Sequence, residues 1–104
     1  MTGPELTVGR GVITEMVRLA AFEIPGVARV ARGGPAWRSA LAGPPIVTNH
    51  SGDGVRVRLW IVARPGQQLV ALTADVRAAV AAAVERLLGL RLESVTVTVD
   101  GVGR

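Results

Sequence analysis

The sequence predicts an α+β fold: a two-layer sandwich in the order α-β-β-α-β, with two helices on one face of a small three-stranded sheet. Two helical patterns of apolar residues and one strictly alternating strand carry this prediction. A length of 104 residues fits one domain. We expect a leader over residues 1–11 and a single domain over residues 12–102.

The first half of the chain predicts one helix followed by an irregular connection. Apolar residues recur at helical spacing over residues 12–23, and Pro25 ends the helix because the residue before a proline disfavours the helical backbone. Residues 27–30 are a short extended segment or the exit of a turn. Residues 32–45 are rich in glycine and proline, which favours a loop. Residues 37–41 within it could form one helical turn.

The second half predicts a hairpin, a long helix and a closing strand. Residues 46–49 and 55–63 form the hairpin, because Gly, Asp and Ser between them suit a tight reversal. Residues 68–88 carry an apolar helical stripe that includes Leu69 and Leu87, and Gly89 suits a left-handed cap. Valine and threonine alternate in the last strand, residues 92–100.

Composition excludes several classes of function. The chain has no cysteine, which excludes disulfides and thiol chemistry, and no apolar run reaches the roughly 18 residues of a membrane-spanning helix. The single histidine, His50, lies beside Ser51 and Asp53 in the expected turn, where solvation is its ordinary role. No paired carboxylates, metal-ligand spacing or phosphate loop is present. We therefore predict no catalytic residue, no cofactor and no metal, and a protein that is not an enzyme.

One strand face resists a purely structural interpretation. If the aliphatic row of residues 55–63 faces the helices, then Arg56, Arg58 and Trp60 face outward. Arginine and tryptophan are typical of protein contacts, but the row could also bind single-stranded nucleic acid, or its arginine stems could simply cover the indole. Trp37, in the glycine- and proline-rich connection, is a second candidate protein contact. The basic residues are all arginine and give a net charge of +4, which steers only mildly towards anionic partners.

Five segments, taken in their order and spacing, resemble the alkaline-shock-protein family of bacterial envelope stress response proteins. They are residues 23–27 (EIPGV), 60–66 (WIVARPG), 76–84 (VRAAVAAAV), 88–90 (LGL) and 95–99 (VTVTV). The resemblance as a whole covers roughly residues 12–102. The chain differs from the family in a compressed hairpin around residues 50–54 and in having arginine as its only cation apart from His50.

The resemblance implies a non-enzymatic protein that acts as an interaction and self-assembly module. It implies a homo-oligomer that is cytoplasmic and is held at the membrane by a small anchor protein, with no direct membrane insertion. The alternative is a small domain that binds RNA or single-stranded nucleic acid. Against this alternative, no Gly-x-x-Gly loop lies between helical segments, where such a domain grips the nucleic-acid backbone.

Overall fold

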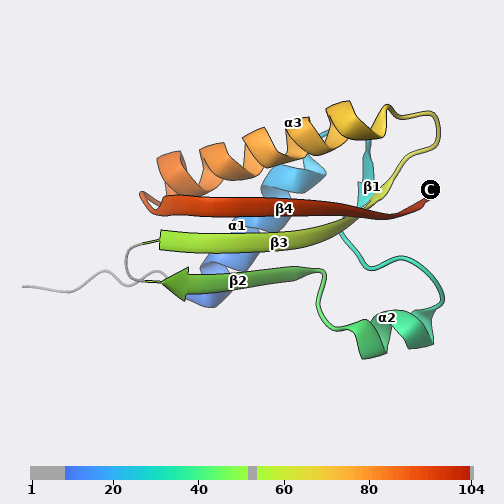
Figure 1. The fold of residues 1–104 in the computed structure, drawn as a ribbon, viewed down its shortest axis with the longest axis horizontal. Helices are drawn as coiled ribbons and strands as arrows, with labels where there is room; N and C mark the ends of the chain where they lie inside the picture. The colour runs from blue at the N-terminus through green and yellow to red at the C-terminus, as the bar shows by residue number, and fades with distance from the viewer. Residues whose placement is uncertain (1–8, 52–53, 104) are drawn as a thin grey trace, which may run out of the picture.

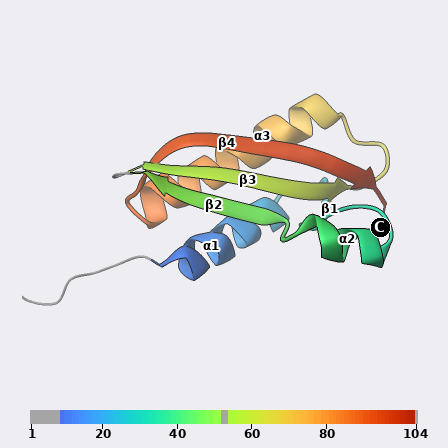
Figure 2. The same ribbon diagram turned by 60° about the horizontal axis from the view of Figure 1, so that its bottom comes forward.

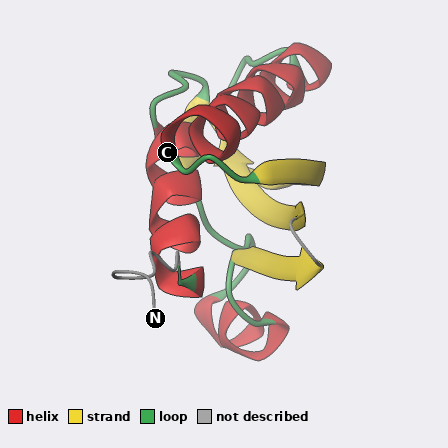
Figure 3. Cartoon of the chain, turned by 90° about the vertical axis from the view of Figure 1, so that its left-hand side faces the viewer, coloured by secondary structure: helices red, strands yellow, loops and turns green. Residues whose placement is uncertain are grey.

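Two helices cover one face of a four-stranded sheet (Figure 1). This is seen in a computed structural model that describes residues 9–51 and 54–103. The helices are α1 (Arg10–Phe22) and α3 (Leu69–Ala82), and Figure 3 shows them as a layer separate from the strands. The predicted two-layer α+β fold is therefore confirmed. Helix α1 begins at Arg10, so the last two residues of the expected leader belong to the helix. Residues 1–8 of that leader lie outside the described residues.

The predicted hairpin is present, and its second strand is the central strand of the sheet. Strands β2 (Ile46–Ser51) and β3 (Gly54–Ala63) pair antiparallel, from Ile46 opposite Leu59 to Ser51 opposite Gly54. The first strand is therefore two residues longer than the sequence predicted. Asp53 of the expected turn lies outside the described residues.

The closing strand completes the other side of β3. Strand β4 (Arg91–Val102) runs parallel to β3 along its whole length, with Val57 opposite Val95. Helix α3 connects the two strands, as a parallel pair requires. The sequence left the strand order open, and the structure places β3 at the centre.

A fourth strand corrects the expected count of three. Strand β1 (Val27–Arg29) pairs antiparallel with the end of β3, where Val27 lies opposite Ala63. Three residues are too few to show an alternating pattern, so the sequence could only suggest an extended segment. The expected helical turn is a helix, α2 (Ala36–Ala42), which lies beyond the start of β2 (Figure 1).

The core lies between the sheet and the two helices. Strand β3 supplies an inward row that alternates with the outer face, and each helix contributes residues at helical spacing. The fully buried members are Ile13, Val17, Ala21, Val55, Val57, Leu59, Ile61, Ala63, Val76, Val80 and Val84. The alternation predicted for β3 is thus confirmed from Val55 to Ile61.

The long helix ends in a π-helical turn, η1 (Ala83–Leu87), which shifts the predicted apolar stripe. The amide of Leu88 donates to the carbonyl of Ala83, five residues back, at 3.3 Å. The wider turn brings Leu88 onto the core and leaves Leu87 69% exposed. The prediction that Leu87 faces the core is therefore wrong. Gly89 adopts the expected left-handed backbone, at φ 67°.

Candidate protein-interaction surfaces

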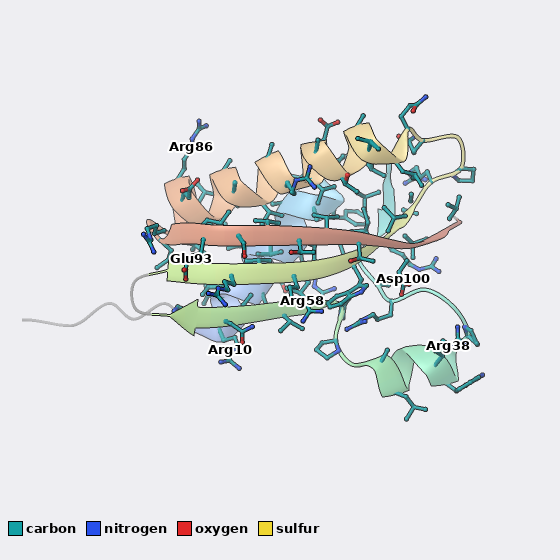
Figure 4. All side chains as sticks on the ribbon, in the orientation of Figure 1. Arg10, Arg38, Arg58, Arg86, Glu93 and Asp100 are labelled. Atoms are coloured by element: carbon teal, nitrogen blue, oxygen red, sulfur yellow. The ribbon has the colours of Figure 1, made fainter. Side chains whose placement is uncertain are left out.

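The outer face of the sheet carries two exposed arginines on its central strand. Arg56 and Arg58 alternate along β3 with the buried Val55 and Val57, so their side chains leave the face opposite the helices. Figure 4 shows Arg58 on the side of the sheet turned towards the viewer, with α1 behind it. The sequence predicted this orientation.

The two arginines have mostly polar neighbours on the adjacent strands. Asn49 and Ser94 lie opposite Arg56, while Thr96 and the apolar Val47 lie opposite Arg58. No ion pair of either arginine is seen among the described residues. Side chains two positions apart on a strand are roughly 7 Å apart, so two positive charges lie close together on one polar surface. Such a surface attracts carboxylate or phosphate groups.

Trp60, the third member of the predicted row, is covered by its own chain. The guanidinium carbon of Arg32 lies 3.3 Å from the centre of the indole ring, and that of Arg58 lies 5.2 Å from it. Trp60 is therefore half-buried, and a base or a partner ring cannot stack on the ring face that Arg32 occupies. Arg56 and Arg58 are therefore exposed as predicted, but much of the Trp60 indole that the sequence predicted to be exposed is covered.

The covering segment is fixed by a contact that the sequence did not reveal. The amide of Gly33 donates to Oδ2 of Asp100, on β4, at 2.8 Å. Because β1 lies on the opposite edge of β3 from β4, residues 30–33 must cross the outer face to make this contact. Val62 is only 2% exposed, although it belongs to the outward row. The glycine pair at 33–34 was the one available signal for a close approach.

Trp37 forms a separate surface. It lies on α2, where it is 66% exposed, and Leu41 of the same helix is 82% exposed. Figure 2 shows α2 beside the end of the sheet and away from the middle of β3. The structure therefore does not bring Trp37 together with Arg56 and Arg58.

The residues of the described chain offer no grouping that could hold a metal. No three His, Cys, Asp or Glu side chains cluster among residues 9–51 and 54–103. His50 is exposed on β2, and its expected neighbour Asp53 lies outside the described part. None of the described helices is both long and apolar enough to cross a bilayer.

Comparison with known families agrees with the fold and with the sequence resemblance. A model of the alkaline-shock-protein family, described as having a cell envelope-related function, matches residues 2–104. The chain belongs to this family. The prediction made from the five sequence segments is therefore confirmed. The match starts before residue 12, where the sequence placed the start of the resemblance. No curated protein matches this alkaline-shock-protein family member in sequence.

Solved structures of the MamM CTD share the fold of this alkaline-shock-protein family member. A manganese form of a MamM CTD variant superposes with a TM-score of 0.58 at 22% identity, over 89% of this chain and 99% of that one. A second MamM CTD structure gives a TM-score of 0.59 at 20% identity, over the same shares of the two chains. A zinc form gives 0.57 at 21% identity, over 88% of this chain and 84% of that one. At these identities the similarity shows a common fold.

Proposed function

We propose that this alkaline-shock-protein family member is a non-enzymatic interaction module of the cell envelope, acting from the cytoplasm. In this proposal, Arg56 and Arg58 bind an acidic segment of a membrane-anchored partner. A different surface of the molecule joins it to copies of itself. Trp37, exposed on α2, is a secondary contact for the partner.

The paired arginines on the open sheet face are the observation that supports this proposal. Two copies that docked through this face would bring like charges together, which opposes self-association there. An acidic segment instead gains two ion pairs, and each exposed pair contributes about 0.2–1 kcal/mol. The outer face therefore selects a partner of opposite charge over a second copy.

Nucleic acid is the less favoured ligand of the same face. Arg56 and Arg58 could contact phosphates, but single-stranded binding gains most from bases stacked on open aromatic rings. Arg32 covers one ring face of Trp60, and Trp37 lies on a different part of the molecule. A protein partner with carboxylates needs no stacking surface.

The test is an NMR titration of the protein with a glutamate-rich peptide at low salt. We expect the largest shifts at amides of β3 and β4 around Arg56 and Arg58. The Arg56→Gln/Arg58→Gln variant should bind about tenfold more weakly, as two lost ion pairs predict. The control variant Arg10→Gln/Arg77→Gln removes the same charge from exposed positions of the helical layer and should bind like the wild type.

Two results would contradict the proposal. Equal losses in both variants would mean that net charge, and not the sheet face, attracts the peptide. A single-stranded oligonucleotide that binds through Arg56 and Arg58 more tightly than the peptide would favour the nucleic-acid alternative. Vesicles with and without anionic lipid, added in place of the peptide, test a charged bilayer as the ligand. Binding of the anionic vesicles through Arg56 and Arg58 would mean that the face recognises a bilayer surface and not an acidic protein segment.

A further inference from the structure

An apolar groove opens between the two helices of the helical layer. It has a cavity volume of about 420 Å³ and lies where α1 passes the C-terminal part of α3 and the π-helical turn η1. Its lining residues are Met16, Leu19, Ala20, Glu23, Ala79, Ala82, Ala83, Arg86 and Leu87. We propose that this groove docks a second copy of this chain across a two-fold axis. The inference rests on the self-association in the proposed function and assigns its surface.

Large apolar side chains line the groove although they are open to solvent. Leu19 is 52% exposed and Leu87 is 69% exposed. They come from different helices, yet both face the same groove, so the exposed apolar surface is contiguous. Contiguous exposed apolar surface marks interaction sites in soluble proteins, because covering it removes that surface from water.

The π-helical turn places Leu87 in this position. In a regular α-helix the apolar stripe of α3 would have continued through Leu87 to the core. The five-residue turn instead brings Leu88 onto the core. π-helical turns inside α-helices frequently occur at functional sites. The turn thus exposes a leucine beside the groove without leaving a gap in the core.

Small residues on α3 allow a partner helix to approach closely. Ala79 and Ala82 of α3, with Ala83 of η1, form one side of the groove. A partner side chain that enters beside these alanines meets short methyl groups. The groove can therefore accept the Leu87 side chain of a second copy.

Charge at the groove identifies a second copy as the occupant. Glu23, at the end of α1, and Arg86, on η1, supply one charge of each sign. Figure 4 shows Arg86 projecting away from the sheet. No ion pair of either residue is seen among the described residues. In a two-fold interface, Arg86 of each copy faces Glu23 of the other, so both pairs form at once.

On the outer sheet face, Arg56 and Arg58 have the same sign and would oppose the same arginines of a second copy docked there. The helical layer also offers enough area for a pair of copies. A stable interface covers about 800 Å² on each partner. That is roughly an eighth of the 6482 Å² surface of the chain, and the helical layer is one of its two broad faces (Figure 3).

The experiment is sedimentation velocity from low micromolar to several hundred micromolar protein. We expect a monomer–dimer equilibrium that Glu23→Arg and Arg86→Glu each weaken by about tenfold, because each places like charges in contact. The double variant Glu23→Arg/Arg86→Glu reverses both signs and should restore the dimer. Leu87→Gln should also weaken it, and circular dichroism checks that each variant folds.

The sheet-face variant Arg56→Gln/Arg58→Gln is the matched control and should dimerise like the wild type. A wild-type protein that stays monomeric at all these concentrations overturns this inference. So does a double variant that dimerises no better than the single variants. Binding of the acidic peptide is measured separately, and its loss in the sheet-face variant supports the proposed partner surface whichever way the dimer experiment ends.

Discussion

At Gly33 the chain passes so close to β4 that a side chain does not fit. A Cβ atom there would lie 2.7 Å from the carbonyl carbon of Asp100, and nearer still to its oxygen. The neighbouring residue, Arg32, covers the indole of Trp60. One glycine therefore decides how much of the tryptophan remains available on the outer sheet face.

Gly33→Ala should lower the free energy of unfolding by about 1–3 kcal/mol, because the new methyl group forces the crossing segment away from β4. The same displacement should move Arg32 off Trp60 and change the tryptophan fluorescence of the folded protein. Urea unfolding measures the first effect. Gly11→Ala is the control: α1 has open space at that position, and alanine should raise stability by up to about 1 kcal/mol. Equal stability of wild type and Gly33→Ala would contradict the close approach.

Thr48 is a buried polar residue on the inner side of β2. It is 3% exposed, lies opposite Val57, and its hydroxyl has no hydrogen-bond partner within the described chain. Thr48→Val keeps the shape of the side chain and removes the unpartnered hydroxyl. The free energy of unfolding should rise by about 1 kcal/mol, measured by urea denaturation. A loss of stability would show that the hydroxyl makes a hydrogen bond after all.

At the scale of elements, the π-helical turn is the place where the apolar pattern of the sequence and the tertiary packing disagree. The apolar stripe of residues 68–88 predicts an inward Leu87 because a regular helix repeats every 3.6 residues. The turn interrupts that repeat. Gly89 follows it with a left-handed backbone, and Leu90 donates its amide to the carbonyl of Val84. The end of the helix is thus set by how the chain must enter β4. The helical pattern of the sequence carries no information about that connection.

The π-helical turn predicts unequal losses of stability for the two adjacent leucines. Leu88→Ala should cost about 2 kcal/mol, because Leu88 packs against the core. Leu87→Ala should change stability by less than about 0.5 kcal/mol when measured at low micromolar concentration, where no dimer contributes. Thermal and urea unfolding of both variants provide the comparison. The reverse order of the two losses would mean that the helix continues regularly through Leu87.

At the scale of the whole molecule, the sequence predicted what repeats locally and missed what connects distant segments. The alternation of β3 and the helical stripes gave both layers and the outward direction of Arg56 and Arg58. Strand β1 is too short to repeat, and the bond from Gly33 to Asp100 joins residues 67 positions apart. Packing of distant segments also sets the surroundings of Trp60, so composition and periodicity could identify the residue but not its exposure.

The same architecture predicts a graded stability across the fold, which hydrogen exchange can measure. Strand β3 has partner strands on both edges and a fully buried inner row, so its amides should exchange only on global unfolding. Helix α2 has seven residues, no side-chain cap bond, and the exposed Trp37 and Leu41. Its amides should open at least about 2 kcal/mol more easily than those of β3.

A difference of that size matters for the secondary contact assigned to Trp37. A helix that opens alone can reorient Trp37 against a partner without disturbing Arg56 and Arg58 on the rigid central strand. Adding the acidic peptide should then slow exchange in α2 more than in β3, because ordering has the largest effect where the free protein is least stable. Equal protection of α2 and β3 in the free protein would instead show that α2 unfolds with the core. Trp37 would then be a fixed part of the surface.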